Sequence, residues 1–167
     1  MIRRVVILWA VVMVVMIFHT ILHEQAHVLA GLIVGISSSV EYDHWFLGGM
    51  TILSSANITP GEYIFISAGP TLFLYMPAFV GMIVAWKRGC SKVMFFLSII
   101  VLDGALYMLG DSFFSGLNNG NGDYAKIGQW ISASTPLPAI TVGLVGGIFI
   151  LFAFGLFCMS CVKILEK

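Results

Sequence analysis

The stretch HTILHEQAHVLAG, residues 19–31, places three histidines and a glutamate inside a long apolar run. The run extends from about residue 5 to residue 34, and about 20 helical residues are enough to cross a bilayer core of ~30 Å. An ionisable side chain at membrane depth costs about 2.5–3.5 kcal/mol on insertion scales. The stretch therefore predicts a membrane-spanning helix whose polar residues serve chemistry rather than packing.

The composition of the whole chain is that of a membrane protein. Its 167 residues are 59% hydrophobic and 10% charged, with a mean hydropathy of +1.01, which is far more apolar than a soluble domain of this length. Three further apolar segments, residues 62–86, 92–114 and 137–165, are each long enough to span a bilayer. The formal net charge is zero and the basic residues lie in small clusters. We therefore expect the lipid bilayer as a partner and no nucleic acid.

The predicted fold class is an all-α membrane protein with about four transmembrane helices. Between the first two spans, VEYDHWF (residues 40–46) and MTILSS (residues 50–55) are rich in β-branched and aromatic residues and flank Gly48 and Gly49. This pattern predicts a membrane-associated β-hairpin.

The other connections carry their own signals. TPGE, residues 59–62, has the pattern of a capping box with proline at the first helical position, which predicts the start of the second span. SGLNNGNGDYAKIGQWISAS, residues 115–134, predicts a re-entrant loop and a short helix between helices 3 and 4. The sequence shows no internal repeat, and we expect a single domain over residues 1–167.

The positive charges predict the orientation in the membrane. In a four-span arrangement one side collects nearly all of them, and only Lys126 falls on the other side. Both termini are therefore expected to be cytoplasmic. The clustered residues are Arg3, Arg4, Lys87, Arg88, Lys92, Lys163 and Lys167.

HEQAH, residues 23–27, is the HExxH pattern of zinc hydrolases. On a helix His23 and His27 stand one turn apart on the same face, so both imidazoles can bind one Zn²⁺ per chain. Glu24 lies beside them and is the expected general base, with zinc-bound water as the nucleophile. His19 lies one turn earlier and about 80° around the helix from His27. It either contacts a metal ligand or the substrate, or it has no role in the site.

A catalytic zinc site needs a third protein ligand, and three aspartates are candidates. Asp111 lies 19 residues after Lys92, as His23 does after Arg4, so both sit ~28 Å from the charged side. Asp103 is only ~16 Å deep by the same measure. Asp123 follows the third span, in a glycine-rich loop that could fold back to the level of the histidines.

These features together resemble the site-2 protease family of intramembrane zinc metalloproteases, over about residues 5–130. The resemblance rests on HExxH in a membrane helix, LGGMT at residues 47–51, SAGP at residues 67–70 and a later aspartate. It implies a three-helix catalytic core, here about residues 5–133, followed by a C-terminal transmembrane helix of about residues 137–165.

The resemblance also implies a third zinc ligand in an Asp-Gly motif that starts a helix after an extended loop. LDG, residues 102–104, matches the letters but lies inside an apolar helix, whereas NGDYAKI, residues 121–127, has the loop-then-helix setting. The expected metal ligands are thus His23, His27 and Asp123, with Asp111 and then Asp103 as alternatives. The expected substrate-binding residues are Gly48, Gly49, Met50 and Thr51 of the hairpin and Asn119 of the loop.

The expected function is that of an intramembrane zinc endopeptidase, which hydrolyses a peptide bond in or near a transmembrane segment of a membrane-protein substrate. The alternatives are a membrane metal-ion transporter and a catalytically silent membrane chaperone that use the same site. The face to which the site opens stays undecided, because family members hold zinc nearer the cytoplasm whereas the charges place HEQAH toward the opposite side. Whether the protein forms a homo-oligomer or binds an accessory membrane protein also stays open.

Overall fold

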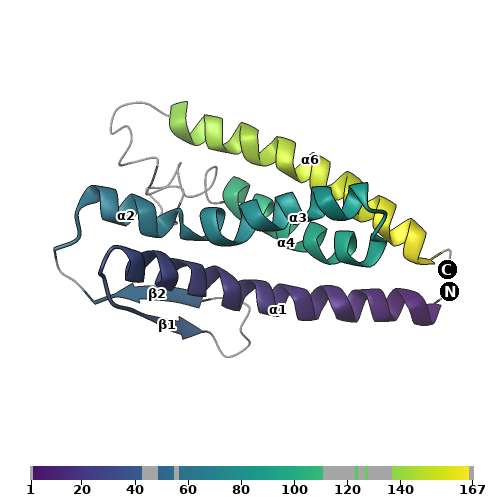
Figure 1. The fold of residues 1–167 in the computed structure, drawn as a ribbon, viewed down its shortest axis with the longest axis horizontal. Helices are drawn as coiled ribbons and strands as arrows, with labels where there is room; N and C mark the ends of the chain where they lie inside the picture. Colours follow the sequence, from purple (N-terminus) through teal and green to yellow (C-terminus); the bar gives the residue numbers. More distant parts are fainter. Residues whose placement is uncertain are drawn as a thin grey trace.

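The computed structural model describes residues 2–42, 49–54, 57–110, 123, 127 and 137–165. This part of the chain is mostly helical, with one two-stranded sheet (Figure 1). Four of its helices are long and apolar enough to cross a membrane. The predicted apolar helices and the hairpin between the first two are confirmed. The predicted re-entrant loop and short helix, apart from Asp123 and Ile127, lie outside the described residues.

Helix α1 (Ile2–Ile33) carries the HEQAH motif in its last third. It ends where Gly35 takes a positive φ of 78° and where the Ile36 backbone N–H donates to the Gly31 carbonyl at 2.9 Å. This is a Schellman cap, which needs glycine at the left-handed position. Ile36 packs against Ala30 and Ile66 in a small buried cluster, so the cap fixes the direction in which the chain leaves toward the hairpin.

The hairpin consists of β1 (Ser38–Tyr42) and β2 (Gly49–Leu53), which pair antiparallel. Val40 lies opposite Thr51 and Tyr42 lies opposite Gly49. Both strands contact the C-terminal part of α1 and lie beside it in Figure 1. The first strand begins two residues earlier than the sequence pattern suggested.

The second apolar segment forms three consecutive helical pieces, α2 (Pro60–Ser67), a π-helical turn η1 (Thr71–Tyr75) and α3 (Met76–Lys87). The predicted capping box is present at its start, between the Thr59 and Glu62 side chains and backbone. Proline cannot donate a backbone hydrogen bond, and Pro70 and Pro77 flank the irregular turn. The segment is long enough to span, but its hydrogen-bond ladder is interrupted beside the HEQAH motif.

Helix α4 (Ser91–Gly110) lies at the centre of the helical layer. It packs against α3 and against α6 (Leu137–Leu165), and it also contacts α1. The main core lies among these helices and includes Met82, Met94 and Ile99. Outward-facing side chains of α1 such as Val6 and Trp9 are exposed, as expected for a helix solvated by lipid. The start of α1 and the end of α6 lie at the same end of the molecule (Figure 1); which side of a membrane this is stays a prediction.

Candidate metal site

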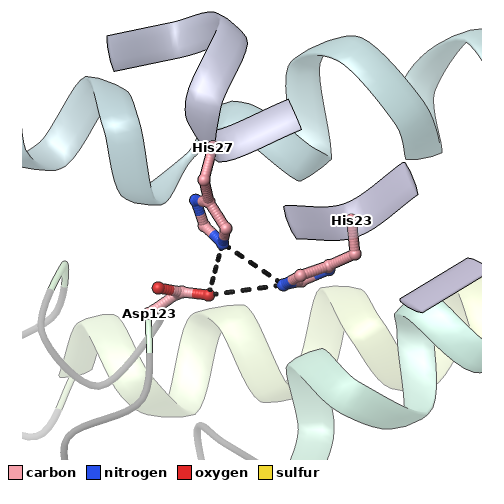
Figure 2. A group of neighbouring side chains, drawn as sticks. All are labelled: His23, His27 and Asp123. Carbon is pink, nitrogen blue, oxygen red and sulfur yellow. Dashed lines mark hydrogen bonds and ion pairs between the residues drawn. The ribbon is translucent and has the colours of Figure 1, made fainter. Parts of the chain in front are cut away.

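His23, His27 and Asp123 converge at one point, and together they could hold a metal ion (Figure 2). His27 Nε2 lies 3.0 Å from Asp123 Oδ2 and 3.2 Å from His23 Nε2. His23 Nε2 lies 3.6 Å from the same carboxylate oxygen. Both histidines are buried, with 7% and 4% of their surface exposed, so both imidazoles lie within the protein.

These separations fit a tetrahedral ion. With metal–ligand bonds of about 2.0–2.2 Å, as for Zn²⁺, tetrahedral geometry separates the ligand atoms by ~3.3 Å. The three separations here run from 3.0 to 3.6 Å. Three protein ligands would leave a fourth position, as in catalytic zinc sites.

The orientation of His27 is fixed by a backbone carbonyl. His27 Nδ1 donates to the Ile66 carbonyl at 2.8 Å, so in the neutral imidazole Nε2 carries the lone pair. That carbonyl is accessible because residue 70 is proline and has no N–H to donate to it four residues back. Nε2 and the Asp123 oxygen are then two acceptors 3.0 Å apart, and such a pair needs a proton or a cation between them.

Close packing holds α2 against the histidine helix. A β-carbon at Gly69 would lie 2.6 Å from the Ala26 carbonyl oxygen and 3.1 Å from Ala30 Cβ. Only glycine allows this approach, and it sets Ile66 within reach of His27. Gly69 and Pro70 of SAGP therefore serve the geometry of the first helix.

Glu24 is buried, with 6% of its surface exposed, and the hairpin holds it in place. Thr51 Oγ1 donates to Glu24 Oε2 at 2.7 Å. A β-carbon at Gly49 would lie 2.7 Å from Glu24 Cγ, so glycine is required where β2 passes the glutamate. The sequence assigned Gly49 and Thr51 to substrate binding, and in the structure both contact Glu24.

Asp123 reaches the histidines from the chain that follows α4. Burial alone would raise the pKa of its carboxyl, but His23 and His27 hold that pKa well below its ordinary value. Tyr107 of α4 contacts two members of the group. Its hydroxyl lies 3.4 Å from Asp123 Oδ2, and its ring packs edge-on against the His23 ring. The two histidines therefore favour the carboxylate form of Asp123, the form that binds metal ions.

A cavity of about 400 Å³ opens beside the group. Glu24, His27 and Asp123 line it, and so do residues of β2. The remaining walls come from α2 and α4. The β2 residues are Gly49, Met50, Thr51 and Leu53, and the helical residues are Tyr63, Ile66, Ser67 and Tyr107.

Asp103 and His19 lie outside the metal group and pair with each other, His19 Nδ1 to Asp103 Oδ2, at 2.5 Å. Of the three aspartates weighed as third ligand, the structure brings Asp123 to the histidines, while Asp111 lies outside the described residues. Gly48 and Asn119, expected to bind substrate, also lie outside them.

Two tyrosines at the site escaped the sequence analysis, Tyr75 and Tyr107. Tyr75 hydrogen-bonds to His19 and His23. The sequence offers one signal for them: each tyrosine lies inside an apolar span, and a buried phenol hydroxyl needs a hydrogen-bond partner. Aromatic side chains are too common in membrane helices for that signal to single them out.

Comparisons of the chain with protein-family models, curated proteins and solved structures returned no match.

Proposed function

We propose that the protein is a membrane-embedded zinc endopeptidase that hydrolyses a peptide bond in or near a transmembrane segment of another protein. The observation that carries the proposal is one constellation: three ligand atoms at near-tetrahedral separations, with the buried carboxylate of Glu24 on the same cavity. The likeness of HEQAH, LGGMT and SAGP to site-2 proteases supports the same function.

The donor set favours zinc among common metal ions. Two imidazoles and one carboxylate are a ligand set that Zn²⁺ binds in hydrolases, whereas Mg²⁺ and Ca²⁺ prefer oxygen ligands alone. When bound, Zn²⁺ would polarise the scissile carbonyl and make a water molecule acidic enough to react near neutral pH. His23, His27 and Asp123 would hold it.

Glu24 would move the proton that hydrolysis requires. The attacking water must lose one proton, and the leaving amine must gain one as the C–N bond breaks. A single carboxylate can accept the first proton and deliver it to the amine nitrogen. The hydrogen bond from Thr51 to Glu24 Oε2 orients this carboxylate.

The cavity suits an extended peptide. The strand β2 lines it with Gly49, Met50 and Thr51, and a strand edge can bind an extended segment through backbone hydrogen bonds. A transmembrane helix hides its carbonyls in its own hydrogen bonds, so the substrate must unwind before it is cut. Strand pairing with β2 would compensate for the helical hydrogen bonds that are lost.

Glu24→Gln is the variant that tests the proposal. We expect it to bind zinc like the wild type, because Glu24 is not a ligand, and to lose cleavage. The reconstituted protein is incubated with a solubilised membrane fraction of the expression host, and new protein N-termini are labelled and identified by mass spectrometry. Glu41→Gln is the matched control, since it makes the same change at an exposed carboxylate of β1.

The outcomes separate clearly. New termini with wild type and Glu41→Gln, but not with Glu24→Gln, support the proposal. New termini that persist at the same rate with Glu24→Gln refute it, as does a purified wild-type protein that takes up no zinc.

A further inference from the structure

A chain of buried polar side chains leads away from the metal group, and none of its outer members is a ligand. Asp103 Oδ2 lies 2.5 Å from His19 Nδ1. His19 Nε2 lies 3.1 Å from the Tyr75 hydroxyl, which in turn lies 2.7 Å from His23 Nδ1. The chain thus joins α4, α1 and η1 in sequence and ends on the ring of a metal ligand.

Burial makes this chain costly unless it serves a purpose. His19 has 5% and Tyr75 has 6% of its surface exposed, and polar groups buried in an apolar helix layer are unfavourable unless they are hydrogen-bonded. The Asp103 side chain keeps 27% of its surface exposed, so the chain runs from a partly open carboxylate into the enclosed site. Packing alone would be served by apolar side chains.

We propose that Asp103, His19 and Tyr75 are positioning residues that fix the tautomer and orientation of His23, so that its Nε2 lone pair faces the metal. This inference rests on the proposed zinc site and adds to it the means by which one ligand is prepared. Metal-bound histidines commonly hold their second ring nitrogen in a hydrogen bond, which selects the tautomer that binds the ion.

The direction of the hydrogen bonds follows from the first member. A carboxylate only accepts, so His19 Nδ1 donates to Asp103. In neutral His19 the other nitrogen, Nε2, then accepts from the Tyr75 hydroxyl. That hydroxyl has one hydrogen, so toward His23 it acts as an acceptor, and His23 Nδ1 must donate. The lone pair of His23 is left on Nε2, the atom that lies 3.2 Å from His27 Nε2.

The backbone around Tyr75 is shaped to hold its ring in this place. Gly104 lies directly against the Tyr75 ring, and a β-carbon there would collide with three ring atoms. Tyr75 is the last residue of the π-helical turn, a geometry that often marks functional positions in helices. Asp103 and Gly104 therefore have complementary roles. Asp103 begins the chain of hydrogen bonds, and Gly104 leaves room for the Tyr75 ring that continues it.

The two histidines are thus held by different means. His27 depends on one backbone carbonyl, which no side-chain substitution removes, while His23 depends on three side chains. Substitutions of Asp103, His19 or Tyr75 should therefore change which nitrogen of His23 is protonated, while His27 keeps its proton on Nδ1, which provides an internal reference.

The test compares wild type, Tyr75→Phe, Asp103→Asn and a control, Tyr42→Phe, in detergent with ¹⁵N-labelled histidine. In zinc-free protein the ¹⁵N shifts report which nitrogen of His23 is protonated. We expect Nδ1–H alone in wild type and Tyr42→Phe, and a mixture of tautomers in Tyr75→Phe and Asp103→Asn. His27 should keep its proton on Nδ1 in every variant, because that nitrogen donates to the Ile66 carbonyl. Zinc affinity, measured by competition with a chelating dye, should fall ~10- to 100-fold in Tyr75→Phe.

The results distinguish this inference from the proposed function. If His23 keeps the Nδ1–H form and full zinc affinity in both variants, the positioning role is wrong although the zinc site stands. If wild type fails to bind zinc, the proposed function fails, while the tautomers of the zinc-free protein still test the hydrogen-bond chain. Asp103→Asn alone decides the matter should Tyr75→Phe not fold, because position 103 is partly exposed.

Discussion

Replacing Gly49 with alanine tests whether the hairpin holds Glu24, the proposed general base, in place. A β-carbon at position 49 would lie 2.7 Å from Glu24 Cγ and 3.3 Å from Glu24 Cδ. Ordinary contact begins at 3.4 Å, so the buried Glu24 side chain must retreat from 2.7 to at least 3.4 Å, a shift of about 0.7 Å. Because a misplacement of about 1 Å can cost ~100-fold in rate, we expect cleavage to fall by about 30- to 100-fold.

Zinc binding should survive this substitution. The nearest atoms that the new methyl group meets belong to Glu24 and Tyr42, and neither is a proposed ligand. The assay is the rate at which new N-termini accumulate in the membrane fraction, with zinc content measured on the same sample. Gly61→Ala is the control, because a β-carbon there meets nothing within 4 Å. Wild-type cleavage by zinc-loaded Gly49→Ala would refute the idea that β2 positions Glu24.

The remaining predictions concern the metal and its supports. Asp123→Ala should lose stoichiometric zinc when metal content is measured by mass spectrometry; full occupancy would show that another residue, such as Asp111, is the third ligand. Chelation of zinc should abolish cleavage and lower the thermal unfolding temperature, and added zinc at 100 times its Kd should restore about 2.7 kcal/mol of stability; an unchanged melt would contradict binding to the folded site. Gly104→Ala should displace Tyr75 and weaken zinc binding, while Gly110→Ala, whose β-carbon meets nothing within 4 Å, should not. Sealed proteoliposomes should show no uptake of zinc, since sustained uptake would favour a transporter.

The helices and the hairpin could be predicted from the sequence because their signals are local. Each span is a long apolar run, and the capping box at Thr59 marks the helix start that the structure shows at Pro60. The interruption of the second span at η1 was not predicted. Its cause is partly non-local: prolines 70 and 77 weaken the hydrogen-bond ladder, but the neighbouring helices decide how the freed backbone groups are satisfied.

Within one helix the site follows from a local pattern, and the resemblance to site-2 proteases added Asp123, which the structure brings to the histidines. His23, Glu24 and His27 follow from helical periodicity, whereas their partners depend on how α4 and η1 are offset along α1. Depth counted from the charged ends places Asp103 at 11 residues and His19 at 15 residues from its own end, a mismatch of ~6 Å. The structure pairs them, so α4 is shifted by about one turn relative to that count. No local sequence pattern indicates how far one helix is shifted along another.

The residues most characteristic of the proposed family do two different kinds of work in this chain. His23 and Glu24 have proposed chemical roles, whereas Gly49, Gly69 and Gly104 have structural ones: each lacks a side chain where a second element approaches closely. Gly49 lets β2 reach Glu24, Gly69 brings α2 to α1 so that a carbonyl meets His27, and Gly104 admits the ring that meets His23. Each side chain of α1 with a proposed catalytic or ligating role therefore has one glycine that allows its supporting element to come near. Ionisable groups in an apolar helix are stable only when polar groups of other elements pack against them. This explains why the residues that support HEQAH lie at several separate places along the sequence.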